Sequence, residues 1–296
     1  MDMSSAILWN GQLIHRNKAV ITASDHGFLY GIGLFETFRT YGGAPWLLER
    51  HAARLAEGCR RLGIAYEPNV AHMREGVATL LAACGLADGY IRWSVSAGAD
   101  MDVVGLPRGA YTAPQEIVYA KALPPDDPAS RPGKALQLLK LRRSSPEGAG
   151  PRLKSFHYMN NVLARRELQA AGADAATEGL FLDGDGYICE GIVGNVFWLK
   201  DGKLYTPSIE TGALPGITRA YVMEMAAAGG IEVREGRYRL SDLTAADEVF
   251  LTNAVQEIVP VVSLMDEQGA VMRTFAAGTQ TREWMLQYRA RAERDD

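Results

Sequence analysis

The chain has 296 residues, 47% of them hydrophobic and 22% charged, so it is long enough to bury the cores of two modest domains. A formal net charge of -4 gives no electrostatic reason to bind nucleic acid or an anionic membrane. Three widely scattered cysteines argue against a disulfide framework and a zinc site, and we expect no bound metal. Without a signal peptide or a membrane-spanning apolar run, the sequence predicts a soluble cytoplasmic protein.

The first 122 residues predict an N-terminal α+β domain. Asn10-Gly11 suits the positive backbone angles of a tight turn and predicts a hairpin between two short apolar strands. A second hairpin is expected where Leu34–Tyr41 and Pro45–Leu48 flank Gly42-Gly43. Apolar periodicity predicts the other elements of this domain, which are helices around residues 52–59 and 70–84 and strands at 90–97 and 116–122.

Residues 123–133 (LPPDDPASRPG) concentrate proline, glycine and aspartate, which disfavours both helix and β-ladder and predicts an interdomain linker. A C-terminal domain is then expected over residues 134–296. Its predicted elements are strands at 135–142, on both sides of 183–186 and 201–202, and at 248–252 and 257–264, with helices at 156–171, from 215 onward and at 275–293. Strands and helices mingle without regular alternation, so the predicted fold class is α+β rather than a doubly wound sheet.

Four local features together match the needs of pyridoxal 5'-phosphate. Lys154 in RLKSFHYMNN offers an amine for a Schiff base. Glu190 in CEGIVGN is a carboxylate in an apolar strand, so it should have a cationic partner and could keep the ring nitrogen protonated. The helix start at Ile217 and Thr218, together with Arg54 in HAARL, could bind the phosphate.

Five segments, in family order over residues 24–262, resemble the successive signatures of the fold-type IV pyridoxal-phosphate enzymes, the class IV aminotransferase superfamily. They are SDHGFLYGIGLFETFR, RLKSFHYMNNVLARREL, EGIVGNVFW, LPGITR and LTNAVQEIVPV. The resemblance implies a two-domain fold like that of D-amino-acid aminotransferase, with the active site between the domains. It also implies a homodimer in which a loop of the neighbouring subunit completes the site.

The resemblance assigns a role to each cofactor-binding position. Lys154 matches the Schiff-base lysine and Glu190 the carboxylate at the ring nitrogen. Arg54 matches the phosphate arginine of the H-x-x-R-L helix, while Ile217 and Thr218 match the backbone cup around the phosphate.

Five further positions complete the expected site. Asn253 and Ala254 occupy the rest of the phosphate strip, and Ala254 stands where aminotransferases often place threonine, so only its backbone N–H could serve. Asn195 matches the asparagine of the EGIVGN block and is either a cofactor ligand or structural. Tyr30 and Tyr158 are expected to line the pocket, with core packing as the alternative.

Three activities compete within the superfamily: 4-amino-4-deoxychorismate lysis, D-amino-acid transamination and branched-chain transamination. D-amino-acid enzymes commonly carry tyrosine at the position of Phe35. They also carry an R-x-H pair in the stretch that here reads SAGADMDVVGLP, which has no such pair. Branched-chain enzymes typically have glycine at Thr37, where the lyases have threonine. RRSSPEGAGPRLKSFHYMNN also resembles the lyases. The resemblance therefore favours the lyase, which forms 4-aminobenzoate for folate biosynthesis; a non-catalytic protein on this fold is a remote alternative.

The lyase interpretation gives individual residues a chemical role. Lys154 would take a proton from the amine-bearing carbon of the small-molecule substrate. Thr37 would relay a proton to the departing group or position it, although a threonine in a strand can also be a simple β-former. Arg92 could pair with a substrate carboxylate, and it also aligns with an arginine of the branched-chain enzymes. His157 is expected to pack or cap rather than to titrate.

Overall fold

The computed structural model describes residues 5–99, 107, 109–146, 148, 150–276 and 278–294. Its contacts divide the chain into two compact units: unit 1 is Met1–Pro125 with Leu153–His157 and Ala292–Asp296, and unit 2 is Asp126–Arg152 with Tyr158–Arg291. The sequence analysis assigned all of residues 134–296 to the C-terminal domain, whereas the structure assigns the segment that contains Lys154 to unit 1. No helix in the described parts of the chain is long and apolar enough to cross a membrane.

Unit 1 is built on a six-stranded antiparallel sheet, counted over the described residues, with strand order β2-β1-β6-β5-β3-β4. The strands are β1 (Ala6–Trp9), β2 (Gln12–His15), β3 (Gly33–Tyr41), β4 (Ala44–Pro45), β5 (Tyr90–Ser96) and β6 (Gln115–Lys121). The first predicted hairpin is confirmed: Asn10 and Gly11 have φ values of 48° and 75° and join β1 to β2. The second hairpin is shorter than predicted, since β4 ends at Pro45 and a helix begins at Leu48.

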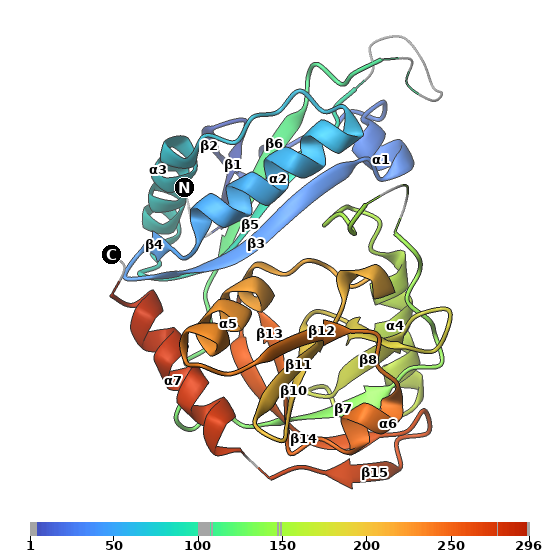
Figure 1. Cartoon of the computed structure of the whole chain (residues 1–296). Coiled ribbons are helices and arrows are strands. Elements are labelled where there is room, and N and C mark those ends of the chain that lie inside the picture. Colours follow the sequence, from blue (N-terminus) through green and yellow to red (C-terminus); the bar gives the residue numbers. More distant parts are fainter. Residues whose placement is uncertain are drawn as a thin grey trace. The chain divides into compact units, whose positions relative to one another are not determined.

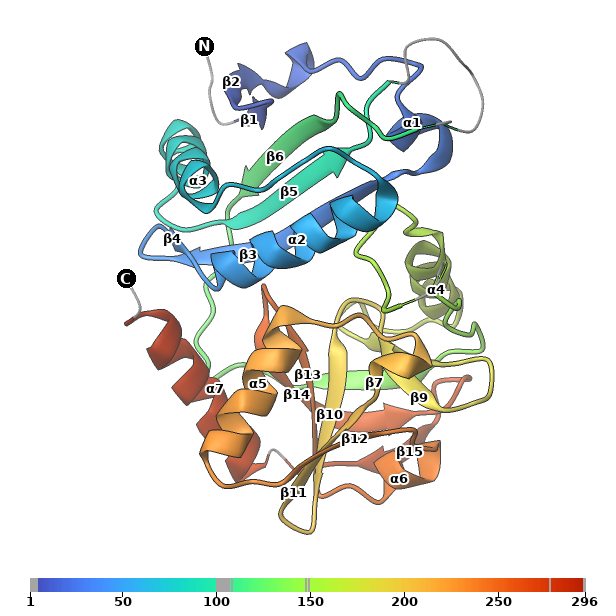
Figure 2. The same ribbon diagram turned by 45° about the horizontal axis from the view of Figure 1, so that its top comes forward.

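Among the described residues, the α-helices of unit 1 are α1 (His26–Tyr30), α2 (Leu48–Leu62) and α3 (Val70–Cys84). Leu55 of α2 and Met73 of α3 share one buried core with Phe38 and Trp93 of the sheet, so both helices cover the same sheet face (Figures 1 and 2). Side chains alternate along a strand, so Phe35 and Thr37 point from β3 to the opposite face. The two faces of β3 therefore present different chemistry.

Unit 2 contains a nine-stranded mixed sheet within the described residues, in the order β12-β11-β10-β13-β14-β7-β8-β9, with β15 paired to β14. Ile188 N of β9 donates to Tyr238 O just beyond β12, at 2.8 Å, so the two ends of this order approach each other. One buried core of this unit draws on β7, β8, β9, β10, β13 and β14. The strands are β7 (Lys134–Leu138), β8 (Glu178–Leu182), β9 (Ile188–Gly191), β10 (Asn195–Lys200), β11 (Lys203–Pro207), β12 (Val233–Gly236), β13 (Glu248–Asn253), β14 (Glu257–Met265) and β15 (Val271–Thr274).

The helices of unit 2 are α4 (Met159–Ala170), α5 (Ile217–Ala228), α6 (Leu240–Thr244) and α7 (Thr279–Ala292). The rings of Tyr221 in α5 and Tyr288 in α7 meet edge to face at 5.5 Å, and the two helices lie side by side (Figures 1 and 2). Both units combine helices with sheets, which confirms the α+β class. The sequence analysis did not predict α1, α6, β12 or β15, because these elements are only four or five residues long.

Candidate functional site

Lys154 lies in an extended segment that runs beside β3. Phe35 N donates to Lys154 O at 2.9 Å, and Phe156 N donates to Gly33 O at 3.0 Å. The expected helix from Phe156 is wrong at its start, because these bonds commit the segment to the sheet and α4 begins only at Met159. The backbone of Lys154 is therefore fixed by a strand rather than by a helix.

The Lys154 side chain lies against the ring of Phe35. Its Nζ is 4.7 Å from the ring centroid, and the Arg92 guanidinium carbon lies 3.6 Å from the same centroid. Both cations are attracted by the electrons of the ring. Thr37 is two residues from Phe35 on the same strand face and stands opposite Arg92 in the register of β3 and β5. The structure thus gathers an amine, a guanidinium and a hydroxyl on one face of the unit 1 sheet.

Arg54 of α2 is held by a buried carboxylate. Glu36 is 1% exposed and accepts from Arg54 Nε at 2.8 Å and from Arg54 Nη2 at 2.6 Å. His51 Nδ1 lies 2.7 Å from the same carboxylate, where it can donate. Sequence reasoning missed Glu36 and His51, although the alternation of β3 placed Glu36 on the helix-covered face.

Burial and the neighbouring charge of Arg54 shift the pKa of Glu36 in opposite directions. Burial raises the pKa of Glu36, but the charge of Arg54 and the hydrogen bonds from Arg54 and His51 lower it to about 2. Burial, together with the charges of Arg54 and Lys154, lowers the pKa of His51 against the opposing effect of the Glu36 carboxylate. Near neutral pH, Arg54 is consequently oriented by an ionised carboxylate.

Of His157 and the two candidate pocket tyrosines, His157 and Tyr30 are in direct contact. His157 Nε2 bonds the carbonyl oxygen of Tyr30 at 3.0 Å and lies so close to Gly31 that a Cβ there would overlap it. This contact agrees with the packing or capping role expected for His157, which stays a prediction. Tyr158 stands at the N-cap of α4 in unit 2 and is 37% exposed. The pocket roles of Tyr30 and Tyr158 stay predictions.

In unit 2, Glu190 is 4% exposed in β9 and does have the cationic partner that burial requires. Arg143 Nη2 lies 2.8 Å from Glu190 Oε1, an ion pair without the angles of a hydrogen bond. Leu214 N donates to Glu190 Oε2 at 2.9 Å. Sequence reasoning missed Arg143, which lies in the segment after the end of β7 at Leu138.

Asn195 joins the carboxylate to the entry of α5. Its Nδ2 donates to Leu214 O at 2.9 Å and lies 3.4 Å from Glu190 Oε2. A Cβ on Gly216 would overlap Asn195 Oδ1, so the glycine permits this close approach. The side chain of Asn195 thus links Glu190 to the entry of α5, and its role as a cofactor ligand stays a prediction.

The start of α5 has the features of an anion site. Its N-cap residue, Gly216, has no side chain that could accept a hydrogen bond. The first amides of the helix, those of Ile217 and Thr218, are therefore not capped by a side chain of that residue. The Thr218 hydroxyl is buried and has no hydrogen-bond partner among the described residues. A buried orphan hydroxyl costs free energy unless a ligand bonds it.

Asn253 and Ala254 lie where β13 turns into β14. Asn253 Oδ1 accepts from Val255 N at 3.0 Å and from Gln256 N at 2.8 Å. The Asn253 side chain thus shapes the turn itself, which leaves backbone N–H groups as the candidate phosphate donors, as expected for Ala254.

The residues present fit pyridoxal phosphate. Unit 1 offers an amine at Lys154 and a guanidinium at Arg54, and unit 2 offers a carboxylate and a helix start. Two buried polar atoms, Glu190 Oε1 and Thr218 Oγ1, have no hydrogen-bond partner among the described residues, and each is of the type that the cofactor's ring nitrogen or phosphate would bond. The diagnostic R-x-H comparison falls largely on residues 100–106, which lie outside the described residues.

Comparison with known proteins gives a consistent result. The family model of amino-transferase class IV matches residues 33–264. The aminodeoxychorismate lyase of Bacillus subtilis is 41% identical over 256 residues, which is 86% of this chain and 85% of the relative. The 4-amino-4-deoxychorismate lyase structure from Pseudomonas aeruginosa is 31% identical with a TM-score of 0.79, covering 97% of this chain and 99% of that one. The branched-chain aminotransferase of Thermobaculum terrenum in its PLP form is 27% identical with a TM-score of 0.81, covering 99% and 95%.

Proposed function

Because the chain belongs to the class IV aminotransferase family, which makes it a pyridoxal-phosphate enzyme, we propose that it is a 4-amino-4-deoxychorismate lyase of folate biosynthesis. The observation that carries the proposal is the position of Thr37, on the strand face where Phe35 contacts both Lys154 and Arg92. The similarity to the lyase of Bacillus subtilis supports the same activity.

We propose that the site residues named above hold the cofactor. Lys154 would bind it covalently, with Arg54 and the amides of Ile217, Thr218 and Ala254 on its phosphate. Glu190, oriented by Arg143 and Asn195, would hold a proton at its ring nitrogen. When bound, the cofactor supplies an electron sink for the carbon that carries the substrate's amine.

The chain's own groups would then carry out an elimination. The Lys154 amine, freed when the substrate's amine takes its place, would remove the proton from the amine-bearing ring carbon. The bond from the ring to the enolpyruvyl oxygen breaks, and the ring becomes aromatic as 4-aminobenzoate. The Thr37 hydroxyl gives a proton to the departing oxygen or orients it, and the released enol becomes pyruvate. Arg92, held over Phe35, pairs with a carboxylate of the dianionic substrate.

Transamination is the alternative, since branched-chain aminotransferases share the fold at high TM-scores. The deciding experiment supplies the loaded enzyme with 4-amino-4-deoxychorismate and no keto acid. Stoichiometric pyruvate and 4-aminobenzoate would support the lyase. Rapid amino transfer from a branched-chain amino acid or D-alanine to 2-oxoglutarate, with no 4-aminobenzoate formed, would replace the lyase by a transaminase.

We also propose that the enzyme is a cytoplasmic homodimer. Three apolar side chains of α4 are exposed on unit 2, namely Met159 at 68%, Val162 at 43% and Leu163 at 43%. Exposed apolar side chains grouped on one helix favour burial against another chain. Light scattering coupled to size exclusion checks the mass, and a monomer at micromolar concentration would contradict the dimer.

A further inference from the structure

The turn between β13 and β14 ends at a residue with an unusual backbone. Glu257 follows the turn, pairs with Asn253 across the hairpin and has φ 62°. A side chain in this left-handed region costs free energy, so such a conformation persists only where its surroundings enforce it. The turn that carries Ala254 therefore ends at Glu257, whose backbone conformation must be held by its surroundings.

Glu257 is held by two arginines. Its carboxylate is fully buried, with Arg131 Nη2 at 2.9 Å from Oε2 and Arg289 Nε at 2.8 Å from Oε1. Arg131 Nη1 also donates to Ile258 O at 2.6 Å, so the same guanidinium fixes the next peptide. The Arg131 guanidinium thus bonds both the Glu257 side chain and the main chain of Ile258 at the start of β14.

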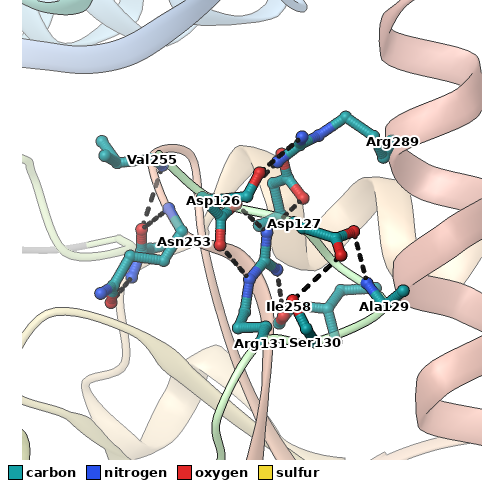
Figure 3. Close-up of polar contacts among 11 residues, drawn as sticks. Asp126, Asp127, Ala129, Ser130, Arg131, Asn253, Val255, Ile258 and Arg289 are labelled. Atoms are coloured by element: carbon teal, nitrogen blue, oxygen red, sulfur yellow. Dashed lines mark hydrogen bonds and ion pairs between the residues drawn. The ribbon is translucent and has the colours of Figure 1, made fainter. Parts of the chain in front are cut away.

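Asp126 closes the arrangement into a ring of alternating charges. It accepts from Arg131 Nε at 2.8 Å and from Arg289 Nη2 at 2.7 Å (Figure 3). Two carboxylates and two guanidiniums balance one another, so each charge of the ring, including the buried Glu257 carboxylate, has two opposite neighbours. The ring joins the start of β14 to helix α7 and to the segment that begins at Asp126.

The segment beside the ring has its own support. Asp127 accepts from Ala129 N at 2.9 Å and from Ser130 Oγ at 3.0 Å, which shapes the loop that presents Arg131 (Figure 3). The members of the ring are therefore anchored on three segments, which are this loop, the start of β14 and helix α7. Such outer support is what keeps a binding group in its productive geometry.

We propose that Glu257 is a positioning residue for the cofactor phosphate: clamped by Arg131 and Arg289, it fixes the backbone of the 253–256 turn so that the Ala254 amide meets the phosphate. The inference rests on the proposed assignment of Ala254 to that phosphate. Glu257 makes no bond to the cofactor itself and acts only through the turn.

The test compares cofactor binding to the apo forms of variants. Glu257→Gln keeps the side-chain shape and removes its charge, and we expect the dissociation constant for pyridoxal phosphate to rise about tenfold with a shifted ³¹P resonance. Glu257→Gly should bind more tightly than Glu257→Ala, because glycine adopts the positive φ without the clamp. Glu232→Gln, which changes an exposed acid paired with Lys203 and Arg234, is the matched control and should change neither readout.

A wild-type dissociation constant and resonance in Glu257→Gln, with only the melting temperature lowered, would overturn the inference. If Glu257→Gln does not fold, Arg289→Gln takes its place with the same two outcomes. Ala254→Pro removes one amide N–H at a turn position that suits proline. Unchanged binding in Ala254→Pro would overturn the phosphate assignment, whereas weakened binding there with unchanged Glu257→Gln would overturn the positioning role alone.

Discussion

The Glu36 carboxylate receives Arg54 through two nitrogens, Nε at 2.8 Å and Nη2 at 2.6 Å. Both partners belong to unit 1. Strand β3 carries the acid, and helix α2, which follows it in the chain, carries the arginine. Two parallel hydrogen bonds fix the plane of a guanidinium as well as its position. The expected phosphate arginine is therefore oriented by the protein before any ligand binds.

The first prediction concerns the pH dependence of stability. Since the pKa of Glu36 falls from 4.5 unfolded to about 2 folded, its ionisation contributes about 3 kcal/mol of stability above pH 4.5. That contribution is lost as the pH falls through the folded value. Urea unfolding of wild type and Glu36→Gln should differ most at neutral pH and converge towards pH 2.

Glu49→Gln is the control for this experiment, because Glu49 is exposed and its pair with Arg74 is screened by water. It should leave the free energy of unfolding nearly unchanged at every pH. A wild-type stability in Glu36→Gln at neutral pH would show that the buried pair does not stabilise unit 1.

The second prediction concerns the covalent link to the cofactor. Lys154→Ala removes the amine beside Phe35, and we expect a loss of turnover by at least about a thousandfold, since the same group is the proposed base. Borohydride treatment followed by peptide mass spectrometry should label Lys154 in wild type and no lysine in the variant. Lys140→Ala, at an exposed position, should keep both the label and the rate. A label on another lysine of the wild type would refute the assignment.

The third prediction separates chemistry from packing at Thr37. Thr37→Val keeps the β-branched shape and removes the hydroxyl, so we expect elimination to slow by about a hundredfold while cofactor affinity is unchanged. Thr37→Ser restores a hydroxyl and should recover most of the rate. Equal rates in wild type and Thr37→Val would reduce Thr37 to a strand former.

The fourth prediction concerns the buried pair of Glu190 and Arg143. Arg143→Met leaves the carboxylate buried without its cation, which we expect to lower the free energy of unfolding by about 3–5 kcal/mol. Arg142→Met changes the adjacent, exposed arginine and should cost little. Chemical unfolding of the apo forms measures both. Similar losses in the two variants would mean that Arg143 has no special role at Glu190.

The sequence by itself determined the local elements and the residue types of the site. Periodicity and turn chemistry identified most helices and strands, because these depend on neighbours within a few residues. Motif order identified the lysine, the carboxylate and the helix start of the candidate cofactor site. The sequence also required a cationic partner for Glu190, since burying an unpaired charge in an apolar strand is costly.

Only the tertiary structure decided which groups orient the site. Glu36 with Arg54, Arg143 with Glu190, and Asp126 with Arg289 join positions that are at least 18 and up to 163 residues apart, a separation at which no local pattern specifies a pair. The same is true of Lys154, whose segment was expected to lead directly into a helix. Hydrogen bonds to β3 compete with helix formation there, and such bonds exist only once the sheet has assembled.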